Sequence, residues 1–600
     1  MDPSRAPSTL WTLTAGQRAR YASAIAAMGV GTIFLLLVPF LLKYTLDGLK
    51  SGEATLVGTL IPAAIGIVAF HAIHGFFTYL RGRWAAQASE GIVRQLRHRL
   101  YQHLERLPCA YHDRADTGDL VQRCSSDVET VRVFLAAQVV EIARVMLFVL
   151  VAIPIMFWHD VTMSLISLSL VPVIVLFAVL FFYKVRGLFK QVDESEGRLT
   201  TVLQENLTGI RVVRAFAQQE FEIEKFQERN DEFRDLEFRL FITLSNYWSL
   251  SDLLVFCQTG LALFVGAYFV QQGHLSLGTW VLFWWLLRQI IWPVRQIGRV
   301  LADTGKASVA LGRIHEILDE LAESEDALPA ESARGTIEVN NLAFSYSGDR
   351  PAIDDLSLTI EEGETVALLG PPGSGKSTLV NLLVRLYEYE QGSIRIGGDE
   401  LNTIDRHAIR DSFGVVLQDP FLYSKTVREN IMLGHISAAD HEVEESARAA
   451  DIHGNILAFE DGYDTKVGER GVTLSGGQRQ RMAIARALLK DPEFLVLDDS
   501  LSAVDTKTEA HILRALASRR GKHTTILIAH RLSSTRLADR IFVLDHGRLL
   551  QQGTHDELLA IEGPYRRLWN IQGTLEDEIE QDLAVSRQVS GPVSGKGDDR

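Results

Sequence analysis

The stretch TVALLGPPGSGKSTLVNLLVRL, residues Thr365 to Leu386, decides the fold of the second half of the chain. An apolar run typical of a buried strand leads into a glycine-rich loop, and a helical pattern follows. The loop matches GxxxxGK[ST], in which glycines let backbone N–H groups point at phosphate oxygens and the helix start adds its positive dipole end. We expect Lys376 to reach the β- and γ-phosphates and Ser377 to ligate Mg²⁺. The predicted nucleotide-binding residues here are Gly370, Gly373, Ser374, Gly375, Lys376, Ser377 and Thr378.

A second stretch, FLVLDDSLSAVD (Phe494 to Asp505), has the pattern of a partner strand. Its apolar run ends in two carboxylates, Asp498 and Asp499. An aspartate at a strand end is usually only a turn residue, but beside a phosphate-binding loop it is placed to hold Mg²⁺. We therefore predict Asp498 as a metal ligand.

The overall composition limits the protein class. The 600 residues exceed one hydrophobic core, so several domains are expected. The formal charge of −15 argues against a nucleic-acid partner bound by a basic face. The three cysteines, Cys109, Cys124 and Cys257, form neither a disulfide framework nor a paired metal spacing, and we interpret them as free thiols.

The first half of the chain carries six apolar runs of bilayer length, since about 20 helical residues cross a bilayer. The first run lacks the short core and cleavage site of a signal peptide, so we interpret it as an anchor. A large soluble helical domain is the weaker alternative, because so many runs reach bilayer length. The runs lie at about 22–46, 55–80, 136–158, 161–183, 246–270 and 277–298.

The loops between these runs set the orientation. The connections after the third and fifth runs are short and lack Lys and Arg, whereas those after the second and fourth are long and basic, with Arg81, Arg94 and Lys184 among their residues. The positive-inside rule places the long connections and both termini in the cytoplasm. Within these connections, the helical arms Asp113–Arg123 and Glu205–Phe216 are the candidate levers between a membrane half and a cytoplasmic half.

An acidic stretch with one proline separates the two halves, and beyond it short apolar strands alternate with helices. We expect five segments. They are a cytoplasmic N-terminal segment (1–20), a transmembrane domain (21–320), a linker (321–335), a nucleotide-binding domain (336–573) and a flexible acidic, then Gly/Ser-rich tail (574–600).

A third motif makes a family resemblance specific. LSGGQ precedes a helix, and two glycines at a helix start again form an anion site; its residues are Leu474, Ser475, Gly476, Gly477 and Gln478. LSGGQ between the glycine loop and LDD…SAVD resembles the nucleotide-binding domain of an ABC ATPase. With six spans upstream, residues 15–573 resemble an ABC exporter half-transporter. The implied fold is a polytopic α-helical membrane domain with long cytoplasmic arms, plus a cytoplasmic α/β P-loop ATPase domain with a helical subdomain.

The resemblance assigns further roles. It implies ATP and Mg²⁺ as cofactors, with Tyr346 stacking on adenine and Gln418 sensing Mg²⁺. Ser502 to Asp505 match the D-loop, His530 matches the switch histidine at the γ-phosphate, and Glu469 lies where exporters touch their coupling helices. In this family two nucleotide domains enclose two ATP molecules, each site using the glycine loop of one chain and the LSGGQ of the other, so a second half-transporter is implied. The implied catalytic set is Asp499, His530 and Gln418, and the implied metal set is Ser377, Gln418 and Asp498.

Position 499 departs from the family pattern, which usually has glutamate as the general base. A base must lie within about 2.6–3.2 Å of its proton, directly or through one water, and aspartate is one methylene shorter. Asp499 is therefore predicted to be a weak base, as in heterodimeric exporters in which one chain carries a degenerate site and its partner carries the glutamate. One alternative is that Asp499 works as the base through a slight backbone adjustment. The others are a homodimeric exporter with a slow Asp site and a nucleotide-sensing membrane subunit without net transport.

The sequence does not name the cargo. The resemblance implies export of a drug-, lipid- or peptide-like amphiphile across the plasma (bacterial inner) membrane. The tryptophan-rich stretch Trp280–Pro293 either lines a cavity or packs, and the pair His71 and His74 lacks the further ligands of a metal site. Four charged residues inside the runs are either cavity or packing residues: Glu141, Arg144, Asp252 and Arg288.

Overall fold

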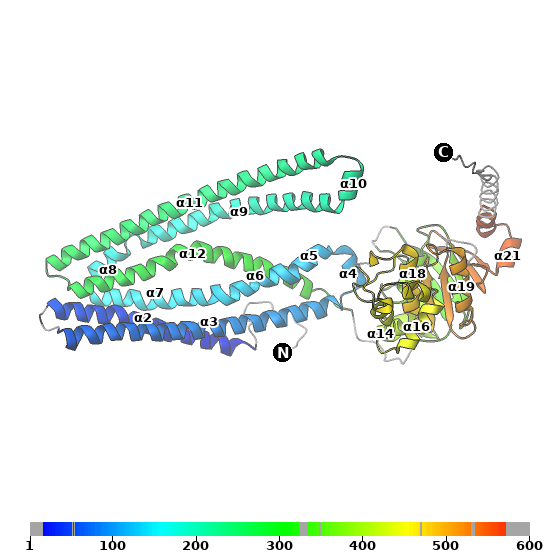
Figure 1. Cartoon of the computed structure of the whole chain (residues 1–600), viewed down its shortest axis with the longest axis horizontal. Helices are drawn as coiled ribbons and strands as arrows, with labels where there is room; N and C mark the ends of the chain where they lie inside the picture. The colour runs from blue at the N-terminus through cyan, green and yellow to red at the C-terminus, as the bar shows by residue number, and fades with distance from the viewer. Residues whose placement is uncertain are drawn as a thin grey trace, which may run out of the picture. The chain divides into compact units, whose positions relative to one another are not determined.

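The computed structural model describes residues 16–50, 52, 55–323, 333–346, 350–468, 471–529 and 535–571. The chain divides into two compact units (Figure 1). One holds the residues up to Leu107 and Ala115–Leu321, and the other holds Pro108–Arg114 and the residues from Ala322 onward. The predicted N-terminal segment and linker lie partly outside the described residues, and the predicted tail lies wholly outside them.

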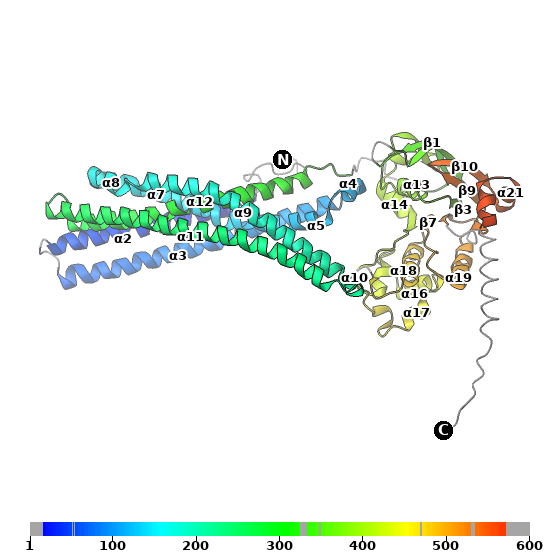
Figure 2. The same ribbon diagram turned by 90° about the horizontal axis from the view of Figure 1, so that it is seen from above.

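The first unit is a bundle of long helices that run side by side (Figures 1 and 2). Three π-helical turns, Leu56–Leu60, Arg123–Asp127 and Phe134–Gln138, interrupt or extend them. The helices are α2 (Arg18–Lys50), α3 (Ile61–Leu104), α5 (Thr117–Gln122), α6 (Val128–Val133), α7 (Val139–His159), α8 (Val161–Leu168), α9 (Val171–Thr208), α10 (Ile210–Ala215), α11 (Gln219–Gln271) and α12 (Leu277–Leu318).

Five helical stretches of this unit are long and apolar enough to cross a membrane, and they contain the first five predicted spans. They are Arg18–Lys50, Leu56–Leu104, Thr117–His159, Val161–Thr208 and Gln219–Gln271. The sixth predicted span, 277–298, lies in α12, which is not among the five, so the count of six stays a prediction.

Polar caps fix two of the short connections. Asp160 ends α7 and accepts a hydrogen bond from the backbone N–H of Met163 at 2.6 Å, which starts α8. At the other connection, the Asp47 carboxylate accepts from the Ser276 hydroxyl at 2.8 Å and from the Gly278 N–H at 2.9 Å. A Cβ at Gly278 would lie 2.2 Å from the carbonyl oxygen of Lys43, so only glycine lets α12 approach the end of α2 this closely.

Most of the tryptophan-rich stretch on α12 is packing surface. Phe283 and Leu286 are fully buried in the apolar core that α12 shares with α2, α7, α8, α9 and α11, and Trp280 and Trp285 pack against that core. Trp292, in contrast, is 55% exposed. Helix packing therefore explains Trp280, Phe283, Trp285 and Leu286.

Two of the charged residues inside the spans have partners on the same unit. Asp252 on α11 pairs with Arg295 on α12 at 2.7 Å, and Arg295 also lies over the ring of Trp248. Arg288 is exposed, with its guanidinium 6.0 Å from the ring centroid of Trp284. Asp252 is thus a packing residue that joins two helices. The remaining pair, Glu141 and Arg144, lines a cavity that is treated below.

The second unit is built on two sheets. The larger has the order β10-β9-β3-β8-β7-β6, in which β6, β7, β8, β3 and β9 run parallel and β10 pairs antiparallel with β9. Its strands are β3 (Thr365–Leu369), β6 (Phe413–Val416), β7 (Phe494–Asp498), β8 (Thr524–Ile528), β9 (Arg540–Asp545) and β10 (Arg548–Gly553). The smaller, antiparallel sheet has the order β2-β1-β4-β5, with β1 (Ile337–Phe344), β2 (Ile353–Ile360), β4 (Gln391–Ile396) and β5 (Asp399–Glu400).

Helices complete this unit. The strongly apolar strands β3, β7 and β8 are buried on both faces, as expected for a parallel sheet covered by helices. A separate apolar cluster joins α15, α16, α17 and α18 to that sheet and forms the expected helical subdomain. The helices are α4 (Cys109–Arg114), α13 (Lys376–Leu383), α14 (Arg406–Ser412), α15 (Val427–Met432), α16 (Asp440–Ala449), α17 (His453–Leu457), α18 (Gly476–Leu489), α19 (Thr506–Ala517) and α21 (His555–Ala560), with short 3₁₀ turns at Leu401–Thr403 and Gly462–Asp464.

Candidate functional site

The carboxyl ends of three parallel strands meet at one edge of the larger sheet. β3 pairs with β8, and β8 pairs with β7, so that Asp498 lies opposite Ile528 in the ladder. The glycine loop leaves the end of β3, and Asp498 is the last residue of β7. Ligands of open α/β sheets bind at this edge, so the loop and the carboxylate predicted as one site do share an edge.

Two glycines of the loop have no room for a side chain. A Cβ at Gly370, where φ is +152°, would lie 2.1 Å from the carbonyl oxygen of Leu544, and one at Gly375, where φ is +97°, would lie 2.6 Å from that of Ala352. At Gly373 the same position meets nothing within 4 Å. The loop is thus packed against the domain at both ends and open between them, as a cradle for a phosphate chain requires.

Lys376 is a buried cation at the start of α13. Its ammonium donates to the carbonyl oxygens of Gly370 and Pro371 at 2.8 and 2.9 Å and to the Ser374 hydroxyl at 3.2 Å. Burial lowers the pKa of Lys376, and the nearby carboxylates Asp498 and Asp499 oppose that shift. A cation held inside the loop is suited to bind phosphate oxygens.

The predicted metal ligands supply mixed oxygens. Asp498 is buried, whereas Ser377 on the first turn of α13 and Gln418, two residues beyond β6, are exposed. Within the described residues no three His, Cys, Asp or Glu side chains gather into a metal-binding group. The oxygens present fit Mg²⁺, which binds through one or two protein oxygens together with nucleotide phosphates.

Asp499 has a left-handed backbone, with φ at +44°. Its N–H donates to the carbonyl oxygen of Ile528 at 3.1 Å, and its own carbonyl oxygen accepts from the Ser502 hydroxyl at 2.8 Å. Asp and Asn tolerate this conformation better than longer side chains, because their short polar groups bond locally. The backbone at the predicted base is therefore anchored on both sides.

Tyr346 offers a half-exposed aromatic ring beside the glycine loop. It is 50% exposed, and its hydroxyl lies 3.4 Å from the Thr378 hydroxyl on α13. Phe344 and Tyr387 meet the ring edge-on, with centroids 5.0 and 4.9 Å away. These contacts fix the ring while leaving surface free for stacking.

LSGGQ forms a capping box at the start of α18. The Gln478 N–H donates to the Ser475 hydroxyl at 3.3 Å, and the Ser475 N–H donates to the Gln478 side-chain oxygen at 2.9 Å. A Cβ at Gly477 would lie 2.8 Å from the carbonyl oxygen of Ala503, whereas one at Gly476 meets nothing within 4 Å. Leu474, which precedes the box, packs partly against the core of the helical subdomain.

The D-loop, Ser502 to Asp505, follows β7 and contacts this helix. The buried side chain of Gln480 on α18 accepts from the Ala503 N–H at 3.2 Å. At the end of the loop, Asp505 caps α19 and accepts from the N–H groups of Lys507 and Thr508 at 3.1 and 3.0 Å, which lowers its pKa. The D-loop thus holds both the signature helix and the backbone of Asp499.

Two sets of contacts in this unit are not predicted by the sequence. The Tyr387 hydroxyl donates to the Asp113 carboxylate on α4, so the tyrosine that holds Tyr346 also bonds the start of the predicted arm. Burial and this bond raise the pKa of Tyr387.

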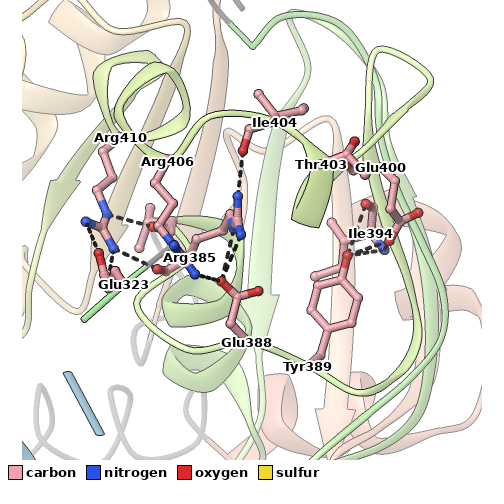
Figure 3. Close-up of polar contacts among 11 residues, drawn as sticks. Glu323, Arg385, Glu388, Tyr389, Ile394, Glu400, Thr403, Ile404, Arg406 and Arg410 are labelled. Carbon is pink, nitrogen blue, oxygen red and sulfur yellow. Dashed lines mark hydrogen bonds and ion pairs between the residues drawn. The ribbon is translucent and has the colours of Figure 1, made fainter. Parts of the chain in front are cut away.

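The second is an arginine cluster beside α14 (Figure 3). Arg410 binds the Glu323 carboxylate through two bonds, at 3.0 and 2.9 Å. Arg385 and Arg406 converge on Glu388. The Arg406–Glu388 and Arg410–Glu323 pairs join residues 18 and 87 positions apart, so no local sequence pattern predicts them. His530 and Glu469 lie outside the described residues, so their predicted contacts stay predictions.

Comparison with known proteins covers both units. Residues 23–294 match the family described as "ABC transporter transmembrane region", and residues 353–502 match "ABC transporter". YknU of Bacillus subtilis (strain 168), described as an uncharacterized ABC transporter ATP-binding protein, is 33% identical over 553 residues, which cover 92% of this chain and 94% of YknU. YgaD of the same strain, named as a candidate multidrug export ATP-binding/permease protein, is 35% identical over 554 residues, with 90% and 94% covered. The solved structure of a bacterial Atm1-family ABC exporter with ATP bound matches with a TM-score of 0.81 and 28% identity, covering 93% of this chain and 99% of that one.

Proposed function

The chain belongs to the ABC transporter family, and from this premise we propose that it is the slowly hydrolysing subunit of a heterodimeric exporter. The protein is an ATP-hydrolysing exporter, a multi-pass protein of the inner membrane with its ATPase domain in the cytoplasm. As a half-transporter it functions as a dimer, with itself or with another chain. The proposal concerns the partner, the chemistry of the site and the cargo.

Asp499 is the observation that carries the heterodimer proposal. Asp499 occupies the sequence position at which the family usually has its general base, but its side chain is shorter and hydrogen bonds hold its backbone on both sides. Because its backbone is held, Asp499 cannot shift to make up for the missing methylene, so its carboxylate stays short of the position that a glutamate carboxylate reaches. A displacement of about 1 Å costs on the order of 10²-fold in rate. We therefore assign slow hydrolysis to this chain's own site.

The remaining groups support intact nucleotide binding. In the proposed site, the loop N–H groups and Lys376 would hold the phosphates, and Tyr346 would stack on adenine. Ser377, Gln418 and Asp498 would hold Mg²⁺, which when bound neutralises phosphate charge. Thr378 orients the Tyr346 hydroxyl, and we keep His530 as the group at the γ-phosphate.

The intact LSGGQ supports a role at the partner's site. Its capping box is complete, and Gly476 leaves its helix start open for a phosphate of the nucleotide held by the other chain. We propose that the partner has a glutamate directly after its own aspartate that corresponds to Asp498. The same box would serve equally in a homodimer, which is the alternative to be tested, beside a regulatory subunit without net transport.

For the domain limits we propose a membrane domain over 21–320 and a nucleotide-binding domain over 336–573. The cargo we propose is an amphiphile of drug-, lipid- or peptide-like character, in line with the multidrug export named for YgaD. Transport would be measured as ATP-dependent movement of a labelled amphiphile in sealed vesicles.

The experiment that tests the proposal is ATP turnover of this chain purified alone in lipid nanodiscs, with its mass measured on the same sample. We expect a monomer or a nearly inactive dimer that still binds ATP. A dimer turning over at rates ordinary for exporters, about 1–10 s⁻¹ on the general scale of enzymes, would refute the heterodimer. Lys376→Ala is the control, because it should abolish ATP binding at this chain's site.

A further inference from the structure

A cavity of about 270 Å³ lies between α2, α3, α7 and α12 of the helical unit. Three of its lining residues on α3, His74, Thr78 and Arg81, are spaced i, i+4 and i+7, so they share one helix face. Glu141 and Arg144 line it from α7. This cavity belongs to the membrane half, and no nucleotide-site residue contributes to it.

The charge of the lining is unbalanced. The Arg144 guanidinium binds the Glu141 carboxylate through two bonds, one of them 3.0 Å long, so these two charges neutralise each other. Arg81 has no hydrogen-bond or ion-pair partner among the residues that the structure describes. One uncompensated positive charge therefore lines the cavity, at the cytoplasmic edge of the second predicted span.

Neighbouring residues show that Arg81 is set apart. Arg83 on the same helix is exposed and does not line the cavity, whereas Arg81 is only partly exposed. His74 donates from Nδ1 to the Gly31 carbonyl oxygen at 2.9 Å, since a carbonyl can only accept, and this bond ties α3 to α2 beside the cavity. The exposed His71 bonds its own helix at Ile67, so the two histidines do not converge on a metal.

The cavity has a charged end and an apolar end. α7 runs away from the cytoplasm, and Phe148 lies seven residues, about 10 Å, deeper along it than Glu141. α3 runs toward the cytoplasm, so Arg81 lies about 10 Å nearer the cytoplasm than His74. The charges therefore gather at the cytoplasmic end, and Leu35 and the buried Phe148 line the wall with apolar surface.

We propose that this cavity binds the anionic group of an amphiphile taken from the inner leaflet, with Arg81 as the cation that recognises it. The inference rests on the proposed export of amphiphiles and narrows their class to anions, with a carboxylate, sulfonate or phosphate head on an apolar tail. A guanidinium pairs with such heads by charge-assisted, bidentate bonds. The Gln289 amide and the Thr78 hydroxyl on the lining add neutral hydrogen-bonding groups.

Glu141 sets the charge of the cavity. While it is bound to Arg144, only Arg81 is available to an anion. Removal of its charge would leave two guanidinium groups facing the same space. Glu141→Gln should therefore strengthen binding of an anion, a gain that damage to the fold would not produce.

The test measures binding without ATP in the full chain held in phosphatidylcholine nanodiscs. The probe is phosphatidylglycerol with a dansyl group on its acyl chain, read by energy transfer from the protein's tryptophans. Phosphatidylcholine with the same label is the zwitterionic comparator. We expect the anionic probe to bind at least about 10-fold tighter than the zwitterionic one.

The variants should change the preference for the anionic probe in opposite directions. Arg81→Gln should remove most of that 10-fold preference, Arg83→Gln should leave it unchanged, and Glu141→Gln should increase it. Equal affinity for the two probes, or equal losses in the Arg81 and Arg83 variants, would overturn the assignment. Displacement of the probe by millimolar inorganic phosphate would refute an amphiphile as the ligand and identify a site for a free anion.

The binding test for anion selectivity and the transport test for the proposed function can fail independently of each other. Binding in the absence of ATP does not depend on transport, so a vesicle assay can fail while the charge preference holds. Transport of zwitterionic and anionic probes at equal rates would leave the export function standing and reject the anion selectivity.

Discussion

Replacing Asp499 by glutamate should accelerate ATP hydrolysis at this chain's own site. The substitution restores the side chain that the family usually has at this position. In the structure the Asp499 backbone is held by the carbonyl oxygen of Ile528 at 3.1 Å and by the hydroxyl of Ser502 at 2.8 Å. Because neither bond involves the side chain, the longer residue should keep the same backbone position.

The expected gain in hydrolysis rate follows from the length of the side chain at position 499. One added methylene moves the carboxylate forward by about one C–C bond, roughly 1.5 Å. A base misplaced by about 1 Å loses on the order of 10²-fold in rate, which corresponds to about 2.7 kcal/mol of transition-state stabilisation. Against this stands the left-handed backbone, with φ at +44°, where glutamate is less favourable than aspartate by up to about 1 kcal/mol. That cost falls on folding stability rather than on the transition state, so we expect turnover to rise 10- to 100-fold.

The assay is single-turnover hydrolysis in nanodiscs by a dimer that contains the full chain, because each site needs the LSGGQ of a second chain, with ATP affinity measured in parallel. Asp355→Glu is the matched control, because Asp355 also has a left-handed backbone, with φ at +55°, but lies on β2 of the smaller sheet, where its carboxylate accepts a hydrogen bond from the Asn341 amide. It should leave turnover unchanged. If Asp499→Glu gives no gain while Asp499→Asn abolishes hydrolysis, aspartate is a working base here and the argument from reach is refuted.

Three further predictions concern other parts of the site. Ser475→Ala removes one bond of the capping box, so we expect it to lower helix stability by about 1 kcal/mol and to reduce turnover of the dimer, while ATP affinity at the same chain's glycine loop stays constant; a change in that affinity would contradict the assignment to the partner's site. Tyr387→Phe keeps the ring against its neighbours but removes the bond to Asp113, so ATP affinity should persist while stimulation of ATPase activity by cargo falls; equal stimulation in both proteins would exclude a coupling role. Gly370→Ala places a Cβ 2.1 Å from the carbonyl oxygen of Leu544 and should lower the melting temperature as well as ATP binding, and wild-type values of both would show that the loop can shift.

The sequence correctly predicted the strand and the helix on either side of the glycine loop, because the motif itself dictates that geometry. GxxxxGK[ST] requires a strand before the loop and a helix after it, and β3 ends at Leu369 while α13 begins at Lys376. The first five membrane runs were equally clear, because apolar length alone identifies them. The capping box was also visible as S-x-x-Q, but LSGGQ was interpreted only as an anion site.

Contacts between distant residues could not be predicted from one sequence. Tyr387 and Asp113 are 274 positions apart, and no sequence pattern near either residue predicts their hydrogen bond. The cavity lining depends on four helices packing together, so the spacing of His74, Thr78 and Arg81 on α3 gains meaning only when α7 brings its charges to the same place. The backbone angle at Asp499 likewise follows from the ladder with β8 and the D-loop, not from the residue type.

The D-loop links the weak base to the group that this chain would give to its partner. The Ser502 hydroxyl holds the carbonyl oxygen of Asp499, and the next residue, Ala503, contacts Gly477 and bonds Gln480 on the signature helix. A motion that repositions one end of this loop must therefore displace the other, since the intervening residues are few and hydrogen-bonded. In the proposed heterodimer, a nucleotide held for a long time at the Asp499 site would keep the D-loop in one place and so keep the LSGGQ presented to the partner's site. Slow hydrolysis would then serve the cycle by stabilising the signature surface through several turnovers of the partner, and Asp499→Glu should shorten the lifetime of the dimer while it raises the rate at its own site.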